Sequence, residues 1–292
     1  MKAWLQLFRI HHWVKNVLVF AGVVFSRSFY NPLLVHEALL TFLAFCFASS
    51  LVYVLNDWRD IEKDKMHPQK CRRPLAAGVI TVKSALPAAI LVGVAGLGIA
   101  YYVSIGVFAI VSGYILLNIS YSLWLKNLML LDVFTISAGF MLRLLAGTAG
   151  LGIKPSAWLI LCGMMLTLFL GFAKRYAEWK CGEDENRQRS RRVLDNYTLP
   201  LLDKYLSMTG IASIICYSLY TVDSATVVQL GSNVMVWSVP PVVFCIFQFL
   251  YLVQKKQAGE NLSREIWQNP GLILSSALWA VIVGLILALS RN

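Results

Sequence analysis

The chain has 292 residues, of which 58% are hydrophobic and only 14% are charged, and its mean hydropathy is +0.65. This composition excludes a single soluble domain and indicates a polytopic membrane protein. The net charge of +11 does not indicate nucleic-acid binding, because no soluble basic domain is left to carry it.

The apolar runs predict an all-α bundle of about nine transmembrane helices, each near the roughly 20 residues that cross a bilayer. The predicted spans are residues 16–31, 36–55, 84–104, 106–124, 129–150, 155–173, 205–224, 233–254 and 270–290. Together they form one transmembrane domain over residues 1–292. Residues 1–15 alternate aromatic and basic side chains, which predicts an interfacial helix. A cleaved signal peptide is disfavoured, because no small-residue cleavage site follows the first apolar run.

Basic residues are distributed unequally between the two sides of the predicted bundle. Of the 26 Lys and Arg residues, 22 fall on the side of the N-terminus and three on the other, while Arg143 falls inside a span. The positive-inside rule therefore predicts a cytoplasmic N-terminus and cytoplasmic loops at 56–83 and 174–204, as in a bacterial-type plasma membrane. An odd number of spans places the C-terminus outside. The positive charge also favours contact with anionic membrane lipids and anionic substrates.

Residues 56–83, called here the first polar segment, carry three carboxylates at spacings i, i+3 and i+7. If the preceding apolar helix continues, Asp57, Asp60 and Asp64 lie on one face of it. Such carboxylates repel each other unless they share a cation, and magnesium favours carboxylates together with substrate phosphates. The alternative is a solvated helix end whose acids are neutralised by neighbouring bases. Those bases are Arg59, Lys63 and Lys65.

Residues 174–204, called here the second polar segment, begin with Lys174 and Arg175 directly after an apolar run. Glu178 follows four residues after Lys174, so the two are expected to pair on a helix. The arginines further on, from Arg187, are either a phosphate site or a positive-inside anchor. Each polar segment follows a helix in comparable register, which suggests two helical units. We expect both segments to open into a shared cytoplasmic mouth, with one side suited to magnesium and the other to phosphate.

Two further residues are ambiguous from sequence alone. Arg143 is a charged residue inside a predicted span, and such residues are candidates for substrate binding. The alternative is that Arg143 forms a buried structural ion pair. Asp132 lies three turns away on the same predicted helix and could partner Arg143 only indirectly. His67 precedes a proline, which favours a role in ending the helix over one in catalysis.

The first polar segment resembles the N-D-x-x-D-x-x-x-D motif of the UbiA-type polyprenyl transferase superfamily. Further stretches resemble a phosphoribosyl-transferring branch of it, over a region from Trp13 to about Tyr197. These stretches are Trp13 to Asn16, His67 to Gly78, Tyr121 and Ser122 with Lys126, Asp132, Gly139 and Phe140 with Arg143, and Lys174 to Glu178. Ordinary members carry a second aspartate-rich motif where this chain begins Lys-Arg-x-x-Glu. The resemblance implies that a cationic face replaces one metal-binding face, although Glu183 to Glu185 could be a displaced second motif.

The resemblance implies a Mg2+-dependent enzyme that moves a phosphoribosyl group from 5-phosphoribosyl-1-diphosphate to a decaprenyl-like polyprenyl phosphate, for cell-envelope precursor synthesis. Diphosphate is released, and no protein nucleophile is needed because the lipid phosphate is already anionic. The implied metal-binding and catalytic residues are Asp57, Asp60 and Asp64. The implied substrate-binding residues are Lys15, Asn56, Lys70, Arg73, Tyr121, Lys126, Arg143, Lys174, Arg175 and Glu178.

The implied roles within that set differ by position. Lys70 and Arg73 are assigned to the diphosphate, and Lys126, Lys174 and Arg175 to the ribose 5-phosphate or the lipid phosphate.

Two alternative functions remain open at this point. An aromatic prenyltransferase of the same superfamily would need a second acidic metal face. A transporter of anionic lipid intermediates would need basic residues along a path across the membrane, whereas nearly all of them lie on one side.

Overall fold

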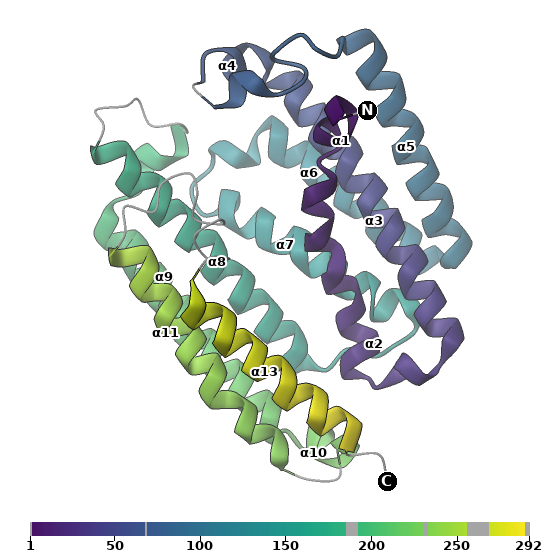
Figure 1. The fold of residues 1–292 in the computed structure, drawn as a ribbon, viewed down its shortest axis with the longest axis vertical. Coiled ribbons are helices and arrows are strands. Elements are labelled where there is room, and N and C mark those ends of the chain that lie inside the picture. Colours follow the sequence, from purple (N-terminus) through teal and green to yellow (C-terminus); the bar gives the residue numbers. More distant parts are fainter. Residues whose placement is uncertain (1, 68, 185–191, 231–232, 256–268, 290–292) are drawn as a thin grey trace. The chain divides into compact units, whose positions relative to one another are not determined.

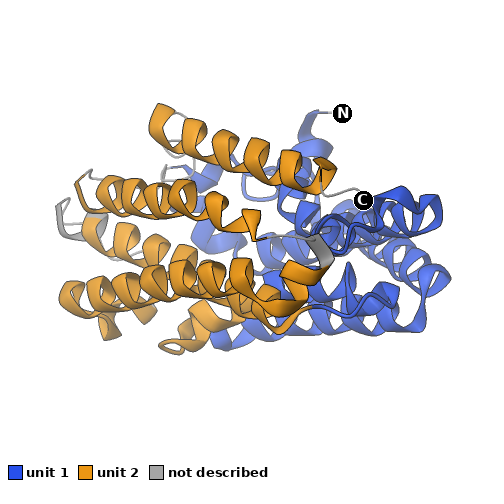
Figure 2. Ribbon diagram, turned by 90° about the horizontal axis from the view of Figure 1, so that it is seen from below, with its two compact units in different colours: residues 1–125, 139–155 blue, residues 126–138, 156–292 orange. Residues whose placement is uncertain are grey.

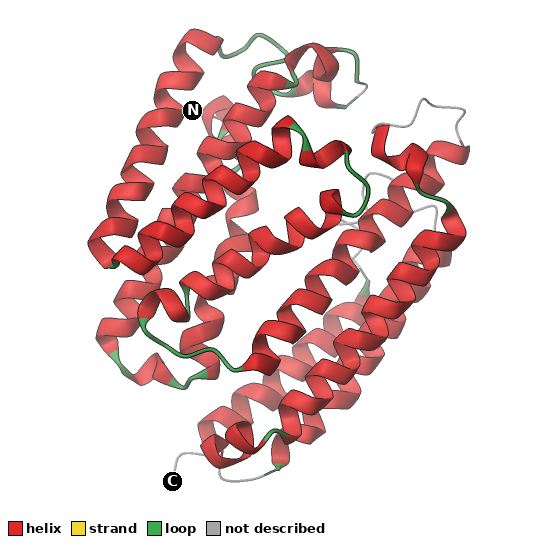
Figure 3. Ribbon diagram, turned by 180° about the vertical axis from the view of Figure 1, so that it is seen from behind, coloured by secondary structure: helices red, strands yellow, loops and turns green. Residues whose placement is uncertain are grey.

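The computed structural model describes residues 2–67, 69–184, 192–230, 233–255 and 269–289. Within these residues every regular element is a helix (Figures 1 and 3). Eight segments are long and apolar enough to cross a membrane. They contain α3 (Pro32–Arg59), α5 (Val82–Val103), α6 (Ile105–Leu123), α7 (Leu131–Ala146), α8 (Ala157–Asp184), α9 (Leu199–Val222), α11 (Val239–Lys255) and α13 (Pro270–Leu289). The predicted all-α membrane fold is confirmed.

The shorter helices lie at the ends of these spans. They are α1 (Lys2–Leu7), α2 (Ala21–Phe25), α4 (Ile61–Lys65) and α10 (Ser224–Leu230), with 3-10 turns η1 (Ile10–Phe20), η2 (Ser28–Tyr30), η3 (Lys70–Arg72), η4 (Leu125–Asn127), η5 (Ala149–Leu151), η6 (Arg192–Asn196) and η7 (Val234–Ser238).

The described residues contain eight helices of spanning length rather than the nine predicted, because the first apolar run does not form one long α-helix. It is built from η1 and α2, which together form a shorter apolar helix over Ile10–Phe25. A 3-10 helix rises about 2.0 Å per residue against about 1.5 Å in an α-helix, so this segment extends roughly 30 Å. That length is close to the thickness of the hydrocarbon core. The predicted span, 16–31, therefore begins six residues too late, because residues 10–15, predicted as part of an interfacial helix, form the start of this apolar helix.

The chain divides into two compact units, drawn in different colours in Figure 2. Unit 1 comprises Met1–Leu125 and Gly139–Pro155 and contains the first polar segment. Its central helix is α3, which α5 approaches closely where α5 carries a glycine. A Cβ placed on Gly96 would lie 2.9 Å from the Cβ of Phe47, so this crossing requires glycine.

Unit 2 comprises Lys126–Ala138 and Ser156–Asn292 and contains the second polar segment. Helices α8 and α9 pack along their lengths, and α11 adds to the same core. The rings of Phe169 on α8 and Phe249 on α11 lie 5.1 Å apart, and Leu202 and Leu206 of α9 are fully buried beside them. Helix α7 is shared, because its first half belongs to unit 2 and its second half to unit 1.

Candidate active site

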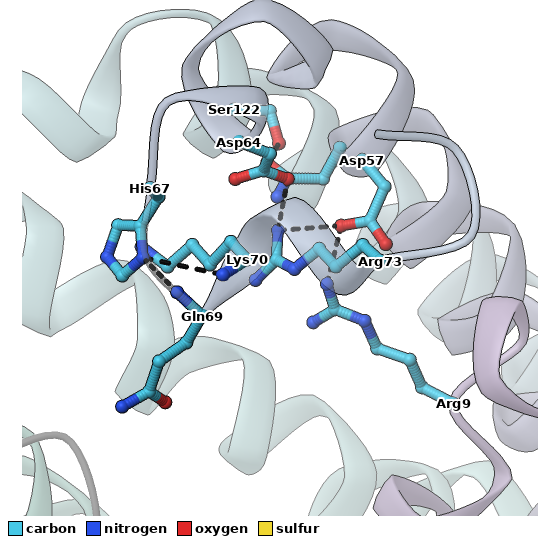
Figure 4. Close-up of polar contacts among 9 residues, drawn as sticks. Arg9, Asp57, Asp64, His67, Gln69, Lys70, Arg73 and Ser122 are labelled. Atoms are coloured by element: carbon cyan, nitrogen blue, oxygen red, sulfur yellow. Dashed lines mark hydrogen bonds and ion pairs between the residues drawn. The ribbon is translucent and has the colours of Figure 1, made fainter. Parts of the chain in front are cut away.

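The acidic face of the first polar segment is built around Asp57 and Asp64, which share one guanidinium (Figure 4). The Nη1 atom of Arg73 donates to Asp57 Oδ1 at 3.1 Å and to Asp64 Oδ2 at 2.6 Å. Both carboxylates are buried, with 3% and 4% of their surface exposed. Residues 56–64 do not form one continuous helix as predicted, because α3 ends at Arg59 and Asp60 adopts a non-helical backbone before α4 begins. The partly exposed Asp60 lies at that break.

Arg9 is a second cation on this face, and sequence reasoning did not select it. Its Nη2 donates to Asp57 Oδ1 at 2.5 Å, and its guanidinium lies 4.8 Å from the centre of the Tyr53 ring. The contact depends on a left-handed backbone conformation at Arg9, with φ of 50° and ψ of 48°, where α1 turns into η1. Gly and, less often, Asn or Asp adopt this conformation, so no residue type in the sequence marked the turn.

Two of the three bases proposed for a solvated helix end, Arg59 and Lys65, contact other groups. Arg59 donates to the carbonyl oxygen of Leu123 at 3.4 Å, and Lys65 pairs with Glu62 at 2.8 Å. Asp57 and Asp64 are therefore neutralised by cations from outside the helix that carries them, which favours a built site over a solvated end.

Backbone and amide contacts hold the rest of this face in place. Asn56 Oδ1 accepts a hydrogen bond from Ser122 Oγ at 3.0 Å, which ties the motif to α6 next to Tyr121. His67 Nδ1 accepts from the backbone N–H groups of Gln69 at 3.3 Å and Lys70 at 3.4 Å (Figure 4). These bonds fix the start of η3, the turn that leads to Arg73, and agree with a structural role for His67.

The donor set of this face fits a magnesium ion that arrives with a phosphate ligand. Among the described residues no three His, Cys, Asp or Glu side chains gather into a complete metal site. Asp57 and Asp64 nevertheless converge on a single cationic nitrogen. Magnesium is commonly held by one or two carboxylates plus substrate phosphates and water, so two convergent carboxylates are sufficient protein ligands.

Arg143 lies in the interior of unit 1 with 5% of its surface exposed. Its Nε donates to Asn16 Oδ1 at 2.7 Å, Nη2 to the Tyr114 hydroxyl at 2.9 Å and Nη1 to the Gly139 carbonyl at 2.6 Å. The guanidinium also lies over the Tyr114 ring, 4.5 Å from its centre. All of these described partners are uncharged, so Arg143 is not part of the ion pair considered as its alternative. Lys15, the residue before Asn16, has an exposed side chain.

The second polar segment contains a buried charge network in unit 2. Arg175 is fully buried, and its Nε donates to Asp132 Oδ2 at 2.5 Å while its Nη1 donates to Glu178. Glu178 therefore pairs with Arg175, and its pairing with Lys174 stays a prediction. The adjacent Lys174 has an exposed side chain.

Tyr197 completes this network and was not among the predicted site residues. Its hydroxyl donates to Asp132 Oδ1 at 3.0 Å and accepts from the Leu130 backbone N–H at 2.8 Å. Burial, reinforced by the nearby Asp132, raises the pKa of Tyr197. Trp179 Nε1 donates to the Tyr197 carbonyl at 2.9 Å, so the start of α7, the end of α8 and the chain after η6 are tied together.

The region also contains Lys126, the residues from Glu183 to Glu185, and the arginines from Arg187 onward. Lys126 lies in η4 with a partly exposed side chain. The side chains of Glu183 to Glu185, and the arginines from Arg187 to Arg191, lie outside what the structure describes.

The fold and the first polar segment place the chain among membrane-embedded polyprenyl transferases. Residues 16–269 match the UbiA prenyltransferase family. The chain belongs to this family and is an integral membrane enzyme of the transferase class.

Individual relatives and solved structures agree with this assignment. The chain is 33% identical to decaprenyl-phosphate phosphoribosyltransferase from Corynebacterium glutamicum over 75% of its own length and 67% of that protein. It is 33% identical to the Mycolicibacterium smegmatis protein of that name, over 73% and 68% of the two chains. In fold it is similar to a UbiA homolog from Archaeoglobus fulgidus bound to GPP and Mg2+, with a TM-score of 0.70, 17% identity and coverage of 99% and 98%.

Proposed function

We propose that this protein transfers the 5-phosphoribosyl group of 5-phosphoribosyl-1-diphosphate to a polyprenyl phosphate and releases diphosphate, with Mg2+ as cofactor. The observation that carries the proposal is the convergence of Asp57 and Asp64 on Arg73, with Arg9 beside them. Such a face suits a metal-bound diphosphate, because it offers carboxylates to the metal and guanidinium groups to the phosphate oxygens. The names of the relatives at 33% identity support the choice of donor and acceptor.

The second polar segment favours phosphoribosyl transfer over prenyl transfer. A prenyltransferase of this family would use a second acidic metal face, for which the chain offers Glu178 and the residues from Glu183 to Glu185; the side chains of the latter lie outside the described part of the structure. In unit 2 the Glu178 carboxylate already accepts a hydrogen bond from the buried Arg175. Arg9 and Arg73 pair with Asp57 in the same way, but they keep 16% and 27% exposure and can turn to a phosphate, whereas Arg175 is 1% exposed and stays with its carboxylates.

Phosphate binding in the second polar segment is assigned mainly to Lys174. Its side chain is exposed, whereas Arg175 is fully buried and would have to leave two carboxylates to reach a substrate. We therefore propose Lys174 and Lys126 as contacts for the ribose 5-phosphate or the lipid phosphate. Arg175 and Glu178 then act mainly by holding the segment in position. We further propose that both polar segments face the cytoplasm of a bacterial plasma membrane, as the distribution of Lys and Arg predicts.

The reaction breaks the bond between C1 of the ribose and the diphosphate oxygen, and forms a bond between C1 and an oxygen of the lipid phosphate. Negative charge develops on the departing diphosphate, so cationic donors aimed at it are the main source of catalysis. Arg73, Arg9 and Lys70 are the donors assigned to this group. Bound magnesium supplies Lewis-acid stabilisation of the same charge. The lipid phosphate needs only to be positioned and partly desolvated, because it is already an anionic nucleophile.

The test is a transfer assay with purified protein in lipid nanodiscs, radiolabelled 5-phosphoribosyl-1-diphosphate and polyprenyl phosphate. We expect labelled lipid with Mg2+ and none when the metal is chelated. Asp57→Asn should lower turnover by orders of magnitude, because it removes a carboxylate from the metal site. Glu62→Gln is the matched control, since Glu62 lies on the same segment but is 80% exposed and pairs only with Lys65 among its described contacts. Turnover of a prenyl diphosphate with an aromatic acceptor, and none of the phosphoribosyl donor, would contradict the proposal.

A further inference from the structure

The contact between Arg9 and Asp57 affects how strongly a metal ion can bind to Asp57. Two carboxylates, Asp57 and Asp64, are matched by two guanidinium groups, Arg9 and Arg73, so the face carries no net charge from these four groups. A divalent cation that approaches alone would meet two fixed positive groups next to its ligands. The Coulomb repulsion between them opposes binding of the bare metal.

We propose that Arg9 couples metal binding to diphosphate binding. Its guanidinium holds Asp57 when no diphosphate is bound and moves to the phosphate oxygens when the metal and the diphosphate bind together. This inference rests on the proposed function, because it assumes that Asp57 is a metal ligand. Beyond the proposed function, we infer that the metal binds weakly when no diphosphate is present, and that Arg9 in the N-terminal segment sets this affinity.

The surroundings of Arg9 allow such a movement without displacing the backbone. Ser50 Oγ donates to the Phe8 carbonyl oxygen at 3.0 Å and accepts a hydrogen bond from Trp13 Nε1 at 3.1 Å. The chain on either side of Arg9 is therefore fixed to α3. The side chain itself keeps 16% exposure and lies over Tyr53, whose ring face attracts a guanidinium that has left its carboxylate. A guanidinium also matches phosphate oxygens with two parallel donors.

A purely structural role for Arg9 predicts the opposite effect on the metal. If Arg9 only anchors α1 and orients Asp57, its removal should loosen the carboxylate and weaken metal binding. If Arg9 competes with the metal for Asp57, its removal should tighten metal binding when no diphosphate is present. The sign of the change therefore separates the two roles.

The experiment measures Mn2+ binding to the full-length protein in detergent, using the electron paramagnetic resonance signal of unbound Mn2+. Arg9→Asn removes the charge and keeps a residue type that tolerates the left-handed backbone. We expect it to bind Mn2+ about tenfold more tightly than the unmodified protein in the absence of diphosphate. In a separate filter assay with Mg2+, Arg9→Asn should retain at least threefold less labelled inorganic diphosphate. Lys2→Asn is the matched control, because Lys2 is an exposed cation on α1, and it should change neither quantity.

Arg9→Lys keeps the test decisive if Arg9→Asn does not fold. Because lysine keeps the charge but lacks the planar fork, Mn2+ affinity should stay within about twofold while diphosphate retention falls. Unchanged or weaker Mn2+ binding in Arg9→Asn, or a loss of Mn2+ binding in Arg9→Lys, would overturn the proposal. Unchanged Mn2+ binding in Asp57→Asn would instead refute the metal site itself and the coupling with it.

Discussion

Asp132→Asn is expected to destabilise unit 2 strongly, although Asp132 is not a proposed substrate contact. Asp132 is fully buried, and its Oδ2 accepts from Arg175 Nε at 2.5 Å while its Oδ1 accepts from the Tyr197 hydroxyl at 3.0 Å. Removing one member of a buried ion pair costs about 3–5 kcal/mol, because the other charge stays buried without full compensation. Arg175 keeps Glu178 as a partner, so we expect the lower end, about 3 kcal/mol.

The assay is reversible unfolding of the detergent-solubilised protein, followed by circular dichroism against an increasing fraction of denaturing detergent. Asp203→Asn is the control, since Asp203 is a partly exposed acid of unit 2 whose Oδ1 accepts from Gln254 Nε2 at 2.8 Å. A surface change of this kind should stay within about 0.5 kcal/mol.

A double variant isolates the pair itself. Arg175→Met combined with Asp132→Asn should cost about 1–3 kcal/mol less than the sum of the single variants, because the second change removes the group that the first left unpaired. Strictly additive costs, or an Asp132→Asn cost no larger than that of Asp203→Asn, would refute the reasoning.

Three further predictions concern the interiors of the two units. Arg143→Met should lower turnover more than Arg143→Lys, with both variants folded by size-exclusion chromatography; equal turnover would contradict a role for its charge. Gly147→Ala should abolish folding or expression, because the added Cβ would overlap the carbonyl oxygen of Val19, whereas Gly113→Ala has open space and should be tolerated. Burial holds the pKa of Tyr197 above its usual value, so stability should fall as the pH rises above roughly 10, where the unfolded chain ionises first. Tyr197→Phe should reduce that fall, and an unchanged pH profile of unfolding would contradict the assignment.

The spacing of the acids predicted that Asp57 and Asp64 lie together on one helix face. They do lie together, but on two helices and joined through Arg73. The same reasoning failed for the backbone between them, since the helix ends at Arg59 and restarts at Ile61. Periodicity describes which face a regular helix presents and contains no information about a break at a polar interface.

The partners of the charges could not be predicted, because they depend on tertiary packing. Lys174 and Arg175 are adjacent in sequence and chemically similar, yet one is exposed and the other fully buried. The difference arises from Asp132, which lies 43 residues earlier and meets only Arg175 of the two in the described contacts. In the same way, Arg9 contacts Asp57, 48 residues later in the chain, because its backbone is left-handed. Arginine is not a residue type that predicts this conformation. Helical spacing relates residues within one helix and does not predict ion pairs between different helices.

The two buried arginines show different ways of keeping a positive charge inside a membrane protein, and the difference bears on which of them can act on an anion. Arg175 is matched by two carboxylates, Asp132 and Glu178, which offset its charge. Arg143 is held by an amide oxygen, a carbonyl, a hydroxyl and aromatic faces, none of which cancels its charge. An uncancelled charge in a medium of low dielectric constant exerts its field over a longer distance than one at the surface. The charge of Arg143 therefore favours an anion nearby in the interior of unit 1, whereas the charge of Arg175 is already matched by its two carboxylates.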